Sequence, residues 1–140
     1  MTNAVSKLLI RKKGQKAAAT PVVVMPEDHG VELGYALSVR QPYAERIMTG
    51  EKTMEYRTWT PPDFVVGKRV WIYATSTYEE GGEGLPIRII VGSVRIDGIE
   101  DLGEGEYGWH LADPLRAEGV GFAFFGCPQP KLWKPTEVIG

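Results

Sequence analysis

Residues 37–59, LSVRQPYAERIMTGEKTMEYRTW, contain the strand–helix–strand pattern that decides the fold. A strand is predicted over residues 35–40, and Pro42 stands where a first helical residue belongs, because its fixed φ suits that position. One apolar face recurs at helical spacing and consists of Ala44, Ile47 and Met48. Gly50 is placed to end this helix of residues 42–49, and a second strand is predicted over 52–59.

The rest of the chain shows short strand signals separated by polar or glycine-rich turns. The predicted strands cover residues 69–76, 87–96, 107–111 and 120–125. Acidic loops are predicted over 79–84 and 97–105, and a proline-rich segment over 128–135. Gly92 marks a bulge or a close approach of another backbone. We therefore expect a mainly β fold with α (α+β), a small β-barrel of five to six strands with a short helix after the first strand.

The composition fits one ordinary globular domain. The chain has 140 residues, 43% of them hydrophobic, and its 16 Lys and Arg nearly balance 18 Asp and Glu, for a net charge of −2. A chain of this size buries about 68–70% of its unfolded surface, so its core needs no metal or disulfide. Cys127 is the only cysteine, which excludes an internal disulfide and a multi-cysteine zinc site and favours a reducing, cytoplasmic location. We expect no membrane span, signal peptide, metal or cofactor, because the sequence lacks their signals.

The charge is unevenly distributed along the chain. Residues 1–20 carry five basic residues and no acid, whereas between Glu79 and Glu106 eight acids outnumber two arginines. We expect residues 1–34 to form a flexible basic extension, and residues 35–140 the folded domain. The extension could be a solvated tail, with at most an edge strand at residues 21–25, or a basic arm for phosphates.

Polar and aromatic side chains gather around the predicted helix beyond what a barrel needs. The candidate nucleic-acid-binding residues are Arg40, Gln41, Tyr43, Lys52, Arg57, Trp59 and Tyr73. The unpaired N–H groups of a helix start suit a phosphate or a carbonyl, and Gln41 can both donate and accept, as reading a base edge requires. Lys52 and Arg57 could bring two cations to one cleft. Each base stacked on an aromatic face would contribute about 1–3 kcal/mol.

Structural roles compete with these binding roles. Glu55 could form an internal ion pair with Arg57 or with Arg40. The aromatic residues that could serve the core or its rim are Trp59 and Tyr73, and those assigned to the core are Trp109 and Trp133. Lys52 is costly to bury and useful in a cleft, so we assign it to the site.

The same segment resembles the opening of an ASCH domain, a member of the PUA-like superfamily of small β-barrels. The family signature, Gly-x-Lys-x-x-x-x-Arg with an acid often at the sixth place, is matched by Gly50, Lys52, Glu55 and Arg57. The resemblance extends to WIYAT at 71–75, IIVGSV at 89–94 and LWKP at 132–135. It covers residues 35–135.

The resemblance implies a function related to RNA, with a cleft between helix 42–49 and the barrel that holds the signature residues. Some small PUA-like proteins hydrolyse an acetylated cytidine nucleoside with a lysine, a threonine three positions on and a distant glutamate; Lys52 fits the lysine, but Glu55 occupies the threonine position. Others have been described as cleaving RNA, which here would use Lys52 to stabilise phosphorane charge and Glu55 as a base.

Three functions therefore remain open from the sequence. The first is a module that binds single-stranded RNA or a modified nucleotide, with RNA, a nucleotide or a nucleoside as partner. The second is a hydrolase acting on RNA or a modified nucleoside through Lys52 and Glu55 as catalytic residues. The third is a protein-interaction adaptor that uses the basic segment and the acidic loops. A nucleophilic pair of Cys127 with His110 lacks an activating helix terminus, and we do not expect it.

Overall fold

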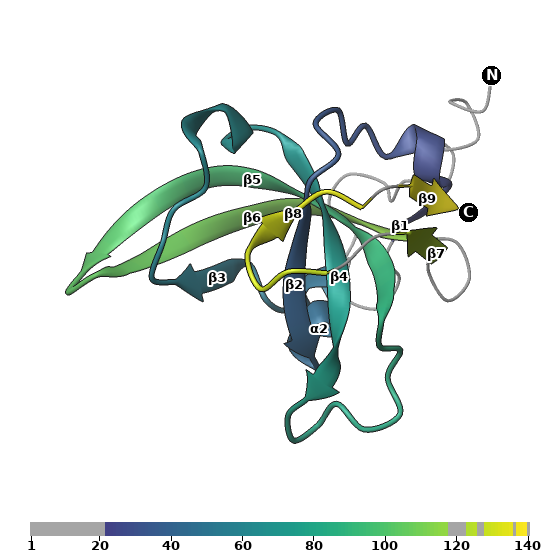
Figure 1. Ribbon diagram of the computed structural model, residues 1–140. Coiled ribbons are helices and arrows are strands. Elements are labelled where there is room, and N and C mark those ends of the chain that lie inside the picture. Colours follow the sequence, from purple (N-terminus) through teal and green to yellow (C-terminus); the bar gives the residue numbers. More distant parts are fainter. Residues whose placement is uncertain (1–21, 118–122, 126–127, 136, 140) are drawn as a thin grey trace, which may run out of the picture.

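The computed structural model describes residues 22–117, 123–125, 128–135 and 137–139 (Figure 1). Its helical elements are the 3₁₀ turns η1 (Pro26–Asp28) and η2 (Asp63–Val65) and the α-helix α2 (Tyr43–Thr49). The strands are β1 (Val22–Val24), β2 (Ala36–Gln41), β3 (Met54–Arg57), β4 (Arg69–Tyr78), β5 (Ile89–Gly103), β6 (Glu106–Ala117), β7 (Ala123–Phe125), β8 (Leu132–Trp133) and β9 (Glu137–Ile139).

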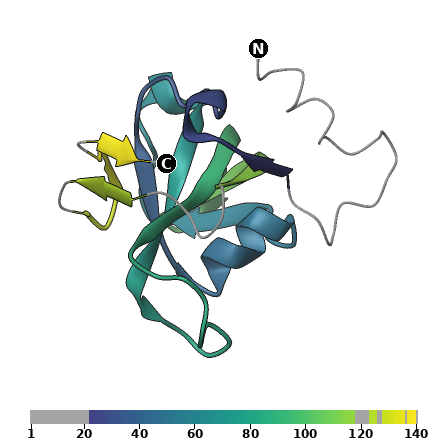
Figure 2. The same ribbon diagram turned by 90° about the vertical axis from the view of Figure 1, so that its right-hand side faces the viewer.

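One curled sheet forms most of the molecule. Its strand order is β1-β6-β5-β4-β2-β8, with β3 paired to β6 beside this path. The pairs β1–β6 and β2–β4 are parallel, and the other pairs in this sheet are antiparallel. β7 and β9 form a separate two-stranded sheet (Figure 2). The expected mainly β fold, a small barrel with a short helix after its first strand, is confirmed. The barrel is a half-barrel made of one seven-stranded sheet, and α2 follows β2, the first long strand.

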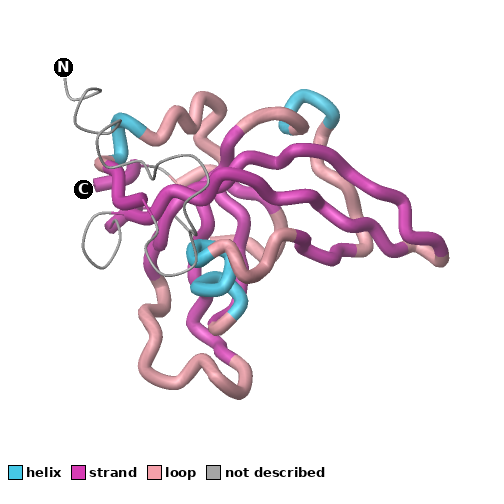
Figure 3. Tube along the Cα trace, turned by 180° about the vertical axis from the view of Figure 1, so that it is seen from behind, coloured by secondary structure: helices cyan, strands magenta, loops and turns pink. Residues whose placement is uncertain are grey.

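The predicted helix is observed with a small change at its start. Ala44, Ile47 and Met48 are its buried residues, as the spacing predicted. Gly50 ends the helix with a left-handed φ of 85°, and its N–H donates to the carbonyl of Ile47. Pro42 is the N-cap, with a φ of −88° and a ψ of 4°, and therefore precedes the first helical residue. The helix contacts β2, β4, β5 and β6 and lies across the sheet when viewed from behind (Figure 3).

Gly92 is a point of close approach, as expected. A Cβ placed there would overlap the carbonyl oxygen of Leu115 in β6 and Sδ of Met48 in α2. The absence of a side chain at this position therefore allows β5 to pass close to both neighbours. Trp109 is fully buried in the main core and Trp133 is buried in a second cluster on the other side of β4, so both tryptophans serve the core as expected.

The expected acidic loop at 97–105 is wrong. β5 continues to Gly103, and Glu104 and Gly105, both with positive φ, form the tip of a long β5–β6 hairpin (Figure 1). This ribbon extends away from the barrel, so many of its side chains meet solvent and acidic residues are tolerated. Its polar sequence therefore resembled a loop.

Residues 22–34 contact the domain. β1 is an edge strand beside β6, at the place where the sequence allowed one. His29 is buried, and its Nδ1 lies 2.6 Å from the hydroxyl of Ser93. The boundary between residues 34 and 35 stays a prediction. Residues 1–20, Cys127 and the first part of the predicted strand 120–125 lie outside the described residues.

No helix among the described residues is long and apolar enough to span a membrane.

Candidate functional site

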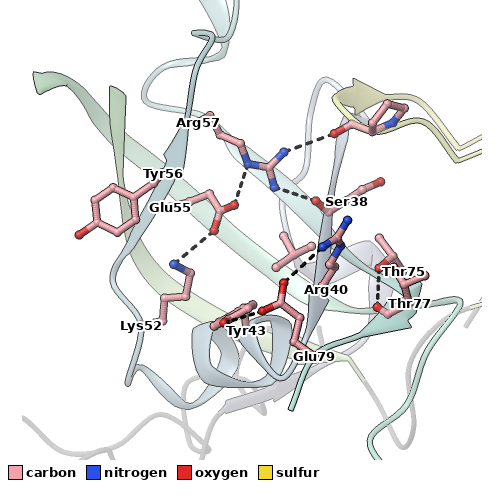
Figure 4. A pocket seen from close by; sticks show the side chains of 12 residues that line it. Ser38, Arg40, Tyr43, Lys52, Glu55, Tyr56, Arg57, Thr75, Thr77 and Glu79 are labelled. Atoms are coloured by element: carbon pink, nitrogen blue, oxygen red, sulfur yellow. Dashed lines mark hydrogen bonds and ion pairs between the residues drawn. The ribbon is translucent and has the colours of Figure 1, made fainter. Parts of the chain in front are cut away.

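A pocket of about 680 Å³ opens between β2 and β3 (Figure 4). Its lining residues are Ser38, Val39, Arg40, Tyr43, Lys52, Glu55, Tyr56, Arg57, Thr75, Thr77, Glu79 and Pro130. β3 pairs with β6, and β2 pairs with β8 only at Ala36 and Leu37. Among the described residues, β2 and β3 share no backbone hydrogen-bond ladder. The gap between these two strands is therefore bridged by side chains.

Arg57 makes this bridge. Its Nε donates to Oε2 of Glu55 at 2.7 Å, its Nη2 to the carbonyl of Ser38 at 2.8 Å, and its Nη1 to the carbonyl of Pro130 at 3.3 Å. The guanidinium thus ties β3 to β2 and to the segment before β8. Three of its five N–H donors are used in this way, so Arg57 holds the pocket wall together as well as giving it charge.

Glu55 lies between two cations of the signature. Its other oxygen, Oε1, is 3.4 Å from Nζ of Lys52. The side chains of Glu55 and Arg57 are only 11% and 15% exposed, so this pair lies in a partly desolvated wall. The predicted Glu55–Arg57 ion pair is observed, whereas Arg40 pairs elsewhere.

Lys52 stands between two tyrosine rings at the pocket wall. Its Nζ donates to the carbonyl of Met54 at 2.7 Å and lies 5.7 Å and 5.3 Å from the ring centroids of Tyr43 and Tyr56. An ammonium over an aromatic face gains about 0.5–2 kcal/mol, and the gain is larger where the cation is shielded from water, as the 18% exposed side chain of Lys52 is. The two rings therefore hold the cation beside faces on which a base could stack.

Arg40 and Tyr43 both bind Glu79. Nη1 of Arg40 lies 3.3 Å from Oε2 of Glu79, and the hydroxyl of Tyr43 donates to Oε1 at 3.0 Å. This hydrogen bond and the nearby carboxylate charge raise the pKa of Tyr43, which keeps its hydroxyl a donor. Arg40 and Glu79 are 59% and 45% exposed, so this contact is open to solvent. Arg40 and Tyr43 thus form an anion-binding pair that a carboxylate of the chain occupies.

Gln41 does not line the pocket. It is fully buried, its Nε2 donates to the carbonyl of Pro86 at 2.8 Å, and its Oε1 accepts from the backbone N–H of Glu45 in α2 at 2.9 Å. Its backbone carbonyl also accepts from the N–H of Glu79. Both ends of the side-chain amide are thus hydrogen-bonded to other residues of the protein, so Gln41 is not placed to read a base edge.

Trp59 and Tyr73 also lie outside this pocket. Trp59 packs edge-on against Trp109 with ring centroids 4.8 Å apart. Tyr73 is buried and packs edge-on against Trp133 at 5.4 Å. Both aromatic residues therefore pack in the core or at its rim, which is the structural role that the sequence left open for them.

Several pocket residues were not among the predicted binding residues, namely Ser38, Tyr56, Thr75, Thr77 and Glu79. β2 and β4 are parallel, with Gln41 aligned to Tyr78, so polar residues at the end of β4 lie beside Arg40. Strand 69–76 was predicted, but its parallel pairing with β2 depends on contacts more than 30 positions apart. Without knowledge of that pairing, the sequence could not place Glu79 beside Arg40.

His110, a histidine outside the pocket, has a carboxylate partner. His110 lies 2.9 Å from the carboxylate of Glu100 on the exposed β5–β6 ribbon. Within the described part of the chain, no cluster of three or more His, Cys, Asp and Glu side chains could hold a metal ion.

Comparisons with known proteins identify the family of the chain and agree with its fold. Residues 37–119 match the family model of the ASCH domain. Among solved structures, an ASCH protein from Zymomonas mobilis aligns with a TM-score of 0.52 at 21% identity and covers 71% of this chain and 85% of that chain. A serine-to-alanine variant of the Zymomonas mobilis protein aligns with a TM-score of 0.51 at 21% identity, over 71% of this chain and 86% of that one. No curated protein matches the sequence.

Proposed function

The chain belongs to the ASCH domain family, and from this premise we propose that it binds single-stranded RNA, or RNA with a modified nucleotide, in the pocket between β2 and β3. The observation that carries the proposal is one cavity in which Lys52 stands between the rings of Tyr43 and Tyr56. A phosphate needs a cation, and an unpaired base needs an aromatic face. This cavity offers both within one wall.

The size and charge of the pocket fit such a ligand. Its volume of about 680 Å³ lies inside the range of about 300–1,000 Å³ for sites that enclose small ligands. Three cations and two carboxylates line it, so its net charge is positive in a chain whose total is −2. The pocket therefore fits one or a few nucleotides better than a long duplex, whose binding requires a broad basic surface.

The test of this proposal is the affinity of the full chain for a short single-stranded RNA across a salt series. Lys52→Ala is expected to weaken binding at least tenfold, because it removes the cation between the two rings. The slope of log affinity against log salt should become shallower by about 0.7, the value for one lost phosphate contact on a single strand. Fluorescence anisotropy measures both quantities.

Lys68→Ala is the matched control, because Lys68 is exposed, pairs with Glu32 and lies outside the pocket. It changes the total charge by the same amount. Equal losses for both variants would indicate nonspecific attraction, and an affinity independent of salt would contradict the proposal.

Glu79→Gln is expected to raise RNA affinity several-fold. In the free protein Glu79 occupies Arg40 and Tyr43, and its charge repels a phosphate at the same place. The amide keeps the shape and removes the charge. Glu83→Gln makes the same charge change in the same loop outside the pocket and should have little effect. Anisotropy titrations of the two variants decide this, and equal affinities would argue against Glu79 as the competitor.

A hydrolase acting through Lys52 and Glu55 is the second candidate, favoured by their 3.4 Å separation in the pocket wall. Both oxygens of Glu55 already contact a cation, so a proton-accepting role requires one of these contacts to open. If the protein is an enzyme, RNA or acetylated cytidine incubated with the wild type should yield product by mass spectrometry, and Lys52→Ala should yield none. A flat time course on both substrates would exclude these two reactions.

A further inference from the structure

A second hollow of about 300 Å³ adjoins the main pocket on the face of β2 and β4. Ser38, Thr75 and Pro130 line both, so the two hollows adjoin each other at these residues. Ser38 fixes this boundary, because its hydroxyl donates to the carbonyl of Gln129 at 2.6 Å and accepts from Nε1 of Trp133. The second hollow is therefore the neighbour of the main pocket on the side of Ser38 and Thr75.

Arg88 supplies the cation of this second hollow. It is exposed, and among the described residues it forms no ion pair with a carboxylate, unlike the pocket arginines Arg40 and Arg57. Its guanidinium charge acts on Tyr73, another lining residue: burial raises the pKa of Tyr73, and Arg88 opposes that rise. The cation is thus available to an anion beside a buried tyrosine.

The backbone at Arg88 is held in an uncommon conformation. Its φ is 59°, in the left-handed backbone region that residues other than Gly, Asn and Asp rarely adopt. Its N–H donates to the carbonyl of Ala74 in β4 at 2.6 Å, which fixes the residue against the sheet. A glycine would suit this position better for folding alone. An arginine here is consistent with a use for its side chain.

We propose that the second hollow, through Arg88, binds the phosphate of the nucleotide next to the one in the main pocket. This inference rests on the proposed function and sharpens it: the ligand is an RNA chain of at least two nucleotides, and a free nucleoside or mononucleotide occupies the main pocket alone. Ser76 and Tyr73 place further polar groups in the same hollow.

The experiment compares the affinities of the full chain and of Arg88→Gly for a mononucleotide and for a single-stranded tetranucleotide. Glycine removes the side chain and fits the left-handed φ, so this variant should fold, which a thermal unfolding curve verifies. The wild type should bind the tetranucleotide more tightly than the mononucleotide. Arg88→Gly should lose about tenfold for the tetranucleotide and nothing for the mononucleotide, whereas Lys68→Ala should change neither.

The possible failures are distinguishable. If Arg88→Gly binds the tetranucleotide as tightly as the wild type, or weakens both ligands equally, the second subsite is wrong while RNA binding at the main pocket stands. If the wild type binds neither ligand, the proposed function fails and this inference fails with it.

Discussion

Gly92→Ala is expected to lower the free energy of unfolding by about 3 kcal/mol, the upper part of the range for inserting an atom into a packed core. The added Cβ would overlap the Leu115 carbonyl and Sδ of Met48. The methionine side chain can move, but the carbonyl belongs to the backbone of β6 and can move only if the β5–β6 pairing changes. Urea unfolding followed by circular dichroism measures the loss.

Gly98→Ala is the control for this substitution. It lies in the same strand, and nothing stands within 4 Å of a Cβ placed there. Its stability should stay within about 0.5 kcal/mol of the wild type, as for substitutions away from special contacts. If Gly92→Ala were equally harmless, the close approach of β5 to β6 and α2 would be wrong.

Arg57→Ala is expected to destabilise the protein by about 2–3 kcal/mol, because removing one member of a largely buried ion pair leaves the carboxylate of Glu55 with one cation in place of two. Glu55 would keep only Lys52, and the carbonyls of Ser38 and Pro130 would lose their donor. Arg40→Ala breaks an exposed pair and should cost less than about 1 kcal/mol. Thermal and urea unfolding of the two variants provide the comparison.

The double variant Arg57→Ala with Glu55→Gln separates charge from bridging. If the carboxylate left without Arg57 causes the loss, the double variant should be more stable than Arg57→Ala alone. If it is not, the bonds to Ser38 and Pro130 carry the effect. An Arg57→Ala protein as stable as the wild type would contradict the role of Arg57 in closing the gap between β2 and β3.

The sequence predicted the local parts of the fold well. The helix, predicted over 42–49 and observed over Tyr43–Thr49, follows from the spacing of Ala44, Ile47 and Met48 and from Gly50, all of which act within a few residues of one another. Strands were predicted over 87–96 and 107–111, but the outer part of the β5–β6 ribbon at 97–105 was missed because it extends from the barrel and carries acidic side chains that a buried strand would exclude. A hydrophobic pattern indicates buried positions, and this outer part is mostly exposed.

The candidate site was predicted in part for a similar reason. Lys52, Glu55 and Arg57 fall close together in sequence, and the structure brings them together in one wall. Gln41 was assigned to the ligand because its amide suits a base, but its orientation depends on Pro86, 45 positions away. Glu79 joins the pocket only through the parallel pairing of β2 with β4, which no local pattern reveals.

Photo-cross-linking tests the central claim, that RNA occupies the pocket between β2 and β3, most directly. The full chain would be irradiated with a short single-stranded RNA that contains 4-thiouridine, and the adducts mapped by mass spectrometry. We expect adducts on the peptides that contain Tyr43 or Tyr56, and fewer of them in Lys52→Ala. Adducts confined to the basic residues 1–20 or to the β5–β6 ribbon would contradict the account.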